Sequence, residues 1–360
     1  MSAHTHRMIW GCCFGFALWL AAGVTSAAAA EVPATPERPQ AALEAEAQAI
    51  ARDYDLPGMS VALARPDGTR MEVAVGLADL ENGRPMTTAT PMLAASIGKT
   101  FVAATVVALA EEGRLGLDDP LARWLGDEPW FARLPNSATI TLRHLLAHRS
   151  GLPDHVHDPA FAAAWQGGAM TLRPRELIAL VLDREPLSGA GDGFTYSDTG
   201  YLLLGLVIEQ VTGSPWEDEV RRRFIRPLGM AHTGPSNSRD IPGLANGYVS
   251  QPNMLDLTPE TLDEDGMLRW DPAVESSGGG FYSTAGDLAA WGAALFSGRV
   301  LGEGALGEML QGGPPAEPDS ASGYGLGVTI IARSEWGPSY GHRGWIPGYT
   351  SSLRYFPEYD

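Results

Sequence analysis

The pattern of hydrophobic and polar positions at residues 41–75 predicts a helix and then a hairpin. Ala41–Asp53 is rich in alanine and glutamate at helical spacing. Two apolar stretches follow, Met59–Ala64 and Met71–Val75, and the turn-forming sequence Pro-Asp-Gly-Thr at 66–69 joins them. We therefore expect a helix followed by a β-hairpin.

The most continuous apolar run after the hairpin extends from Phe101 to Ala110, and the pattern closes at Gly113. A segment that is apolar nearly all round is typical of a buried helix. Ser96 would then lie at the N-terminal end of this helix.

The middle of the chain, residues 117–270, is mostly helical in pattern, with connections rich in proline and glycine. Strand-like alternation returns only at Gly325–Ala332 and Gly348–Tyr355. We expect an α/β part built from about 31–116 and 271–360, and a helical part at about 117–270. The clearest helices in the middle are Thr141–His148, Arg173–Asp183, Thr199–Val211 and Trp216–Phe224.

The first thirty residues have the pattern of an export signal. Arg7 is followed by an apolar run from Ile9 to Val24 and by small residues that end in three alanines before Glu31. This is a signal peptide with an Ala-x-Ala cleavage site, so residues 31–360 form the predicted mature protein. A retained membrane anchor is the alternative, but sixteen apolar residues fall short of a comfortable span. The expected location is periplasmic or secreted, with no stable membrane anchor after cleavage.

Charge and cysteine content narrow the possible partners. The formal net charge is −18, which argues against nucleic acid and against an anionic membrane surface. Both cysteines, Cys12 and Cys13, lie in the signal, so the mature chain has no thiol and can form no disulfide. A small molecule or a peptide is the expected substrate.

Lys99 is the only lysine among 25 lysine and arginine residues. A bias toward arginine follows from genomic base composition, so chance is one explanation. A proton carrier, however, needs an amine that can release its proton, which arginine does not do inside a protein. Lys99 is therefore a candidate for chemistry.

The tetrapeptide Ser96-Ile97-Gly98-Lys99 pairs this amine with a hydroxyl. Residues three apart on a helix share a face, so the ammonium can reach the hydroxyl one turn away. The N–H groups at the helix start add positive potential where an oxyanion would form. A serine three residues before a lysine often occurs by chance in protein sequences. In a chain with a single lysine, a chance match is much rarer.

Two further segments are candidates. Tyr196-Ser197-Asp198 precedes an expected helix; the alternative to a catalytic role is a simple N-cap, which Asp198 would supply well. As a base, Tyr196 would need nearby cations that favour the phenolate, and Lys99 and a histidine could supply them. The second segment is Gly341-His342-Arg343-Gly344 with Trp345, whose alternative is a tight turn with a surface histidine.

In this order the three segments resemble those of serine β-lactamases, penicillin-binding D-Ala-D-Ala carboxypeptidases and their esterase relatives. The stretches at 142–153 and 277–288 resemble framework segments of the same family. The resemblance covers nearly the whole mature chain. It implies an α+β fold, with an antiparallel sheet flanked by helices and a large, mostly helical insertion.

The resemblance also implies roles for individual residues. Ser96 would attack an acyl carbonyl and form an acyl-enzyme, while Lys99 and Tyr196 pass protons. The backbone N–H groups of Ser96 and Trp345 would form the oxyanion hole. His342 would stand where many relatives have lysine, near a substrate carboxylate or the Tyr196 hydroxyl. Asp198, Arg343 and Gly344 are expected beside the substrate, and no metal or cofactor is implied.

This sequence departs from the family pattern at three points. Asp198 replaces the usual asparagine and would hold Lys99 protonated, which favours Tyr196 as the base and Lys99 as electrostatic support. His342 is expected to titrate near neutrality, so activity should depend on pH there. The chain stops at Asp360 after a strand, where relatives continue with another strand and a closing helix; a fragment is the preferred interpretation, and an exposed sheet edge is the alternative.

Other function classes receive less support. Gly337-Pro338-Ser339-Tyr340-Gly341 fits an α/β-hydrolase elbow, but the required aspartate and histidine do not follow it in order. His144 and His148 are spaced to share a zinc ion, but the glutamate of that motif is replaced by Leu145. A non-catalytic penicillin-binding or sensor module stays open. Peptidase, esterase and β-lactamase are not distinguished, although His342 in place of lysine favours the peptidase and carboxypeptidase branch.

Overall fold

A computed structural model describes residues 38–65, 68–166, 172–253, 256–313 and 322–359. The predicted signal peptide, residues 1–30, lies outside these residues. The description below concerns the compact unit that begins at Pro39. Within the described residues, none of the helices has the length and apolar character needed to cross a membrane.

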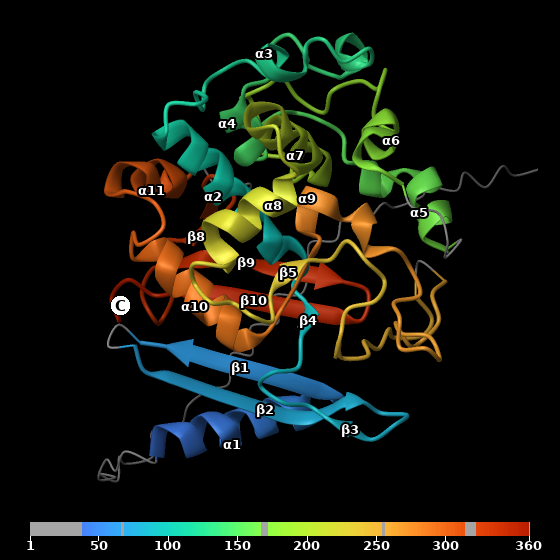
Figure 1. The fold of residues 1–360 in the computed structure, drawn as a ribbon, viewed down its shortest axis with the longest axis vertical. Coiled ribbons are helices and arrows are strands. Elements are labelled where there is room, and N and C mark those ends of the chain that lie inside the picture. Colours follow the sequence, from blue (N-terminus) through green and yellow to red (C-terminus); the bar gives the residue numbers. More distant parts are fainter. Residues whose placement is uncertain (1–37, 66–67, 167–171, 254–255, 314–321, 360) are drawn as a thin grey trace, which may run out of the picture. The chain divides into compact units, whose positions relative to one another are not determined.

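The N-terminal segment folds as the predicted helix and hairpin. Helix α1 (Arg38–Asp53) packs through Ala47 on one face of strands β1 (Gly58–Ala64) and β2 (Arg70–Asp79). The two strands are antiparallel, and the short strand β3 (Arg84–Pro85) extends them to a three-stranded sheet. In Figure 1 this sheet and α1 are drawn in blue.

A second antiparallel sheet comes from the end of the chain, in the order β10-β9-β8-β7. Its strands are β7 (Ser322–Tyr324), β8 (Thr329–Ile331), β9 (Ser339–Ile346) and β10 (Tyr349–Tyr355). The strand predicted at 325–332 is therefore confirmed only in its second half, because Gly327 has a positive φ of 75° and the chain turns there. Strands β4 (Met92–Leu93), β6 (Phe281–Ser283) and β5 (Gly234–Pro235) form a third, small sheet.

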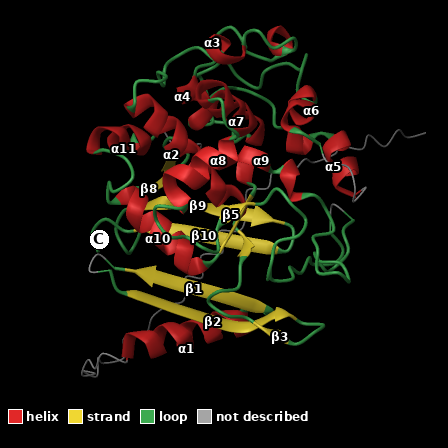
Figure 2. Cartoon of the chain, viewed as in Figure 1, coloured by secondary structure: helices red, strands yellow, loops and turns green. Residues whose placement is uncertain are grey.

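Helix α2 (Gly98–Glu111) lies at the centre of the main core. Its residues from Gly98 to Leu109 are all buried, which confirms the buried helix expected from the apolar run. Phe101 stacks between Phe281 and Trp291, with ring centroids 5.0 and 4.1 Å away. Figure 2 shows that helices surround α2 above the strands.

Helices dominate the middle of the chain, as predicted, although several are shorter than expected. The α-helices are α3 (Ala122–Leu125), α4 (Leu142–Leu146), α5 (Pro159–Gln166), α6 (Pro174–Ala179), α7 (Asp198–Thr212) and α8 (Trp216–Val220). A π-helical turn, η4 (Arg221–Ile225), continues α8. Single 3-10 turns occur at η2 (Phe131–Arg133), η3 (His155–His157) and η5 (Pro272–Val274). Helices α9 (Ser276–Gly279), α10 (Ala285–Phe296) and α11 (Glu303–Leu310) follow. The mixture of antiparallel sheets and helices is the α+β architecture that the sequence predicts.

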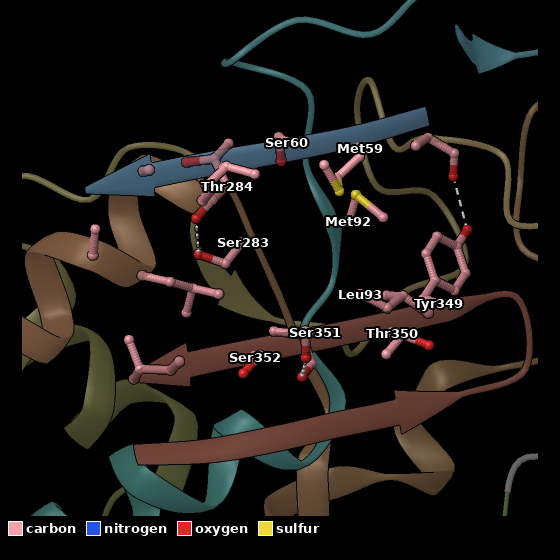
Figure 3. A pocket seen from close by; sticks show the side chains of 18 of the residues that line it. Met59, Ser60, Met92, Leu93, Ser283, Thr284, Tyr349, Thr350, Ser351 and Ser352 are labelled. Carbon is pink, nitrogen blue, oxygen red and sulfur yellow. Dashed lines mark hydrogen bonds between the residues drawn. The ribbon is translucent and has the colours of Figure 1, made fainter. Parts of the chain in front are cut away.

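The first and second sheets are not hydrogen-bonded to each other. Helix α10 packs against both β1 and β10, while a cavity of about 1670 Å³ separates the two strands. Figure 3 shows Met59 and Ser60 on β1 and Ser351 and Ser352 on β10 at opposite sides of this cavity. Among the described strands, β1 pairs only with β2 and β10 only with β9, so each presents one unpaired edge to the cavity.

Candidate active site

Ser96 lies in a 3-10 turn, η1 (Ala95–Ile97), directly before α2. Ala95 has a φ of 49°, in the left-handed region that residues with a Cβ rarely adopt. Such backbone strain, of about 1–3 kcal/mol, is often found at functional sites. Ser96 is partly exposed, while Ala95 and Ile97 are buried. The turn therefore presents the hydroxyl at the surface of an otherwise closed core.

The Lys99 side chain is fully buried, and three oxygen atoms surround its ammonium. Nζ donates to Ser96 Oγ at 3.1 Å, and it also donates to Asp198 Oδ1 and to the carbonyl oxygen of Gly278. Three acceptors match the three N–H donors of an ammonium. Burial by itself lowers the pKa of Lys99, but the Asp198 carboxylate outweighs it and holds this pKa above its ordinary value. Lys99 is therefore a protonated, fixed cation one turn from Ser96.

Asp198 is the first residue of α7, and its carboxylate lies beside Lys99. The N-cap position is Ser197, and its side chain makes no capping hydrogen bond. The Asp198 carboxylate instead pairs with Lys99, so the alternative interpretation of Tyr-Ser-Asp as a simple N-cap is wrong.

The Tyr196 ring lies against the same ammonium, with Nζ 4.9 Å from the ring centroid. Burial raises the pKa of Tyr196 to about 12, although Lys99 and Ser96 both act to lower it. The phenol thus keeps its proton at neutral pH. The cationic neighbour expected from the sequence is present in Lys99, but it does not produce a resting phenolate.

His342 differs from expectation in its surroundings. It is 4% exposed; Nε2 lies 2.8 Å from the Tyr324 hydroxyl and Nδ1 lies 2.5 Å from the carbonyl oxygen of Arg343. Burial lowers the pKa of His342 to about 3. The imidazole is therefore neutral: Nδ1 donates to the carbonyl and Nε2 accepts from the phenol. The expectation that His342 titrates near neutrality is wrong, and so is the alternative of a surface histidine.

Strand β9 lies against the turn that carries Ser96. Gly344 lies so close to the turn before Ser96 that an added Cβ would be 2.1 Å from the carbonyl oxygen of Ala94. Strand β8 covers β9 only at residues 339–341, and β10 pairs with its other side through a two-residue turn at 347–348. Backbone groups of paired antiparallel strands alternate in direction, so the N–H of Trp345 points to the edge that β8 leaves open. The side chains of Arg343 and Trp345 are exposed, Trp345 by 66%.

Two carboxyl groups near Lys99, of which Asp154 is buried and Glu275 is partly buried, were missed by the sequence analysis. Asp154 Oδ2 accepts the N–H of Asp198 at 3.0 Å, and Asp154 is 7% exposed. A Cβ added to Gly279 would lie 3.2 Å from Glu275 Oε2 and 3.2 Å from the backbone nitrogen of Ser96. Burial, together with the negative charge of Asp198, raises the pKa of Asp154 to about 7 and that of Glu275 to about 8. No local motif could have found them, because both reach the site only through tertiary packing.

The two histidines considered for zinc have other contacts. His144 Nδ1 accepts the N–H of Thr141 and caps α4, while His148 Nδ1 accepts the N–H of Ser197. In the described part of the chain, no group of three or more histidine, cysteine, aspartate or glutamate side chains is arranged to hold a metal ion.

Comparison with known proteins places this arrangement in a family. A family model described as Beta-lactamase matches residues 41–360. The chain belongs to the beta-lactamase family. The resemblance expected from the sequence is thus confirmed, and the structure has the α+β fold of this family.

Relatives of this family member carry several different names. A penicillin-binding protein of Bacillus subtilis (strain 168) is 29% identical over 291 residues, which cover 78% of this chain and 61% of the relative. The chain therefore spans about three fifths of that protein. The esterase EstB of Burkholderia gladioli is 31% identical over 268 residues, 69% of this chain and 68% of the esterase.

A solved D-stereospecific amidohydrolase from Streptomyces sp. shares the fold with a TM-score of 0.75 and 30% sequence identity. The match covers 89% of this chain and 90% of that structure. Penicillin binding, ester hydrolysis and amide hydrolysis thus all occur in the names of these similar proteins, and the names do not choose among them.

Proposed function

We propose that this protein is an exported serine hydrolase that cleaves an amide or ester through an acyl-enzyme on Ser96. The observation that carries the proposal is the 3.1 Å hydrogen bond from a fully buried, protonated Lys99 to Ser96 Oγ. A nucleophile oriented by a fixed cation, beside an N–H group on an open strand edge, suits acyl transfer. The predicted signal peptide supports a periplasmic or secreted location.

The resting protonation states favour a proton relay. Both Lys99 and Tyr196 carry protons, so the Tyr196 oxygen accepts the proton of Ser96 while its own proton passes to the leaving amine or alcohol. Oγ of Ser96 bonds to the carbonyl carbon, and the bond to the leaving group breaks. The N–H groups of Ser96 and Trp345 stabilise the oxyanion. Water then repeats the sequence, releases the acid and restores Ser96. Lys99 holds Ser96 and stabilises the negative charge that develops.

The proposed substrate is a small molecule or a peptide bound along the open edge of β9. The exposed Arg343 and Trp345 side chains supply a cation and an aromatic surface there. Peptide or amide cleavage of the D-Ala-D-Ala carboxypeptidase kind is the first choice. Carboxylesterase activity is the second, favoured by the similarity to esterase EstB.

The test is mass spectrometry of the mature protein after incubation with a fluorescent penicillin and, separately, with a fluorophosphonate. We expect one covalent adduct, on the peptide that contains Ser96. An adduct on a different peptide would contradict the assignment of the nucleophile. Product release from D-alanyl-D-alanine peptides and from p-nitrophenyl esters then separates the first two choices. A protein that forms the adduct but releases no product from any of these substrates is a sensor.

A further inference from the structure

His148 is a buried histidine that the proposed reaction does not use. It follows α4, is 1% exposed and has a φ of 54°. A histidine in the left-handed region is uncommon, so the surrounding packing holds it there. Its hydrogen-bond partners lie in the segment that carries Tyr196.

His148 holds the chain on both sides of Tyr196. Its carbonyl oxygen accepts the N–H of Thr195 at 2.8 Å, and its Nδ1 accepts the N–H of Ser197 at 3.1 Å. The imidazole ring also packs on the Tyr196 ring, with centroids 4.0 Å apart and planes 34° apart. Backbone and ring contacts therefore fix the position and the tilt of this one phenol.

The clamp requires a neutral imidazole. Nδ1 can accept from Ser197 only when it carries no proton, so the ring proton lies on Nε2. Burial, together with the charge of Lys99, holds the pKa of His148 well below its ordinary value. The groups that face this ring from the other elements are Lys99 on α2, Tyr201 on α7, Tyr324 on β7 and His342 on β9.

Nε2 has no hydrogen-bond partner within the described residues. The tilt of the ring is therefore set by the Nδ1 contact and by aromatic packing. A donor left without an acceptor in a core costs about 1–3 kcal/mol. A phenylalanine ring at this position would have no unpaired Nε2 donor. A histidine that bears this cost is explained if its Nδ1 is required to hold the N–H of Ser197.

We propose that His148 is a positioning residue for Tyr196: its neutral imidazole clamps residues 195–197 and holds the phenol ring against the Lys99 ammonium. The inference rests on the proposed function, because the positioning concerns the proton relay through Tyr196. It predicts a loss in the rate of acylation rather than in substrate binding.

Two substitutions separate the contacts. His148→Asn keeps an acceptor near the Nδ1 position, and asparagine tolerates a positive φ. His148→Phe keeps an aromatic ring but removes the acceptor. For wild-type-like folds, we expect kcat to fall about thirtyfold or more in His148→Phe and less than about fivefold in His148→Asn, with KM within about twofold in both. We also expect the alkaline limb of the pH profile to move in His148→Phe. Equal kcat values in His148→Phe and wild type would overturn the proposal.

A double-mutant cycle tests the route of the effect. If His148 acts through Tyr196, His148→Phe should slow the labelling of Ser96 by fluorophosphonate in the wild-type background but not in a Tyr196→Phe background. Equal slowing in both backgrounds would show a general structural role and refute the inference. Should His148→Phe fail to fold, His148→Gln replaces it, because its amide lies too far along the side chain to replace Nδ1. A wild-type protein that labels at a residue other than Ser96 would instead contradict the proposed function.

Discussion

Single residues at the site show how burial decides protonation. Lys99 and His342 are both buried, but Lys99 has a carboxylate partner and stays charged, whereas His342 has only neutral partners and stays neutral. The same physics keeps Tyr196 a phenol. Charge at this site is therefore concentrated on Lys99 and Asp198.

Lys99→Arg tests the need for an ammonium at this point. Arginine keeps the positive charge, but its planar fork is larger and cannot fit the space in which one nitrogen contacts Ser96, Asp198 and Gly278. We expect kcat/KM to fall by at least about a hundredfold and the melting temperature to fall, because overpacking a core costs about 1–3 kcal/mol. Steady-state kinetics and thermal unfolding measure the two effects. Near-wild-type turnover would mean that the single lysine is a coincidence.

Glu275→Gln tests the raised pKa of one of the carboxyl groups near Lys99 through its effect on stability. The pKa of Glu275 is about 8 in the folded protein and about 4.3 in an unfolded chain. Between these values the folded state binds more protons, so the free energy of unfolding falls as pH rises through this range. Glutamine has no such proton to lose.

We therefore expect the free energy of unfolding of Glu275→Gln to decline less between pH 5 and pH 8 than that of the wild type. Urea unfolding at the two pH values measures this difference. Glu185→Gln, which changes an exposed carboxyl group, is the matched control and should behave as the wild type. Parallel declines in Glu275→Gln and wild type would contradict the raised pKa.

At the scale of elements, the site depends on two close approaches. The strand β9 meets the turn before Ser96 at Gly344, and α9 meets α7 and Lys99 at Gly278. Each contact joins elements far apart in the sequence. A side chain at Gly344 would separate β9 from the turn that carries Ser96, whereas the carbonyl oxygen of Gly278 is the group that holds Lys99.

Gly344→Ala tests the first approach. Its Cβ would lie 2.1 Å from the carbonyl oxygen of Ala94, which is backbone and cannot rotate away. We expect kcat/KM to fall at least about tenfold and the protein to be destabilised by about 1–3 kcal/mol. Gly304→Ala in α11 is the control, because an added Cβ there meets no atom within 4 Å. The control should keep full activity and gain up to about 1 kcal/mol of stability. A Gly344→Ala protein as active as this control would show that β9 need not touch the turn.

At the scale of the whole compact unit, the separation of the two main sheets is the main feature. Unpaired strand edges at β1 and β10 line the cavity between them, and Leu63 on β1 is 46% exposed. Exposed apolar strand edges pair with other chains unless a charge prevents it. We therefore expect a polypeptide that consists of residues 31–360 to self-associate through β1.

Leu63→Lys should reduce this association by placing a charge on the edge. Light scattering coupled to size-exclusion chromatography, over a range of concentrations, measures the effect. Leu187→Lys is the control, because Leu187 is 61% exposed but lies outside the cavity. A monomeric, unsubstituted 31–360 polypeptide, or equal behaviour of the two variants, would contradict the prediction.

The sequence by itself determined the features that depend on local geometry. The period of apolar residues fixed α1, the hairpin β1–β2 and the buried helix α2, and three-residue spacing was enough to bring Lys99 to Ser96. All of these features depend on residues that are close together in the sequence, where the geometry of the backbone decides which side chains share a face. Helix ends in the middle of the chain were less certain, because tertiary packing and not propensity sets their length.

Only the tertiary structure decided what surrounds these local features. Asp198, Asp154 and Glu275 meet near Lys99 from three separate segments, and His342 is buried with its Nε2 bonded to the Tyr324 hydroxyl. The pKa of a side chain depends on its burial and on its neighbours in space, and neither can be read from a residue's place in a motif. The residue types of the candidate site were thus predictable, whereas their protonation states were not.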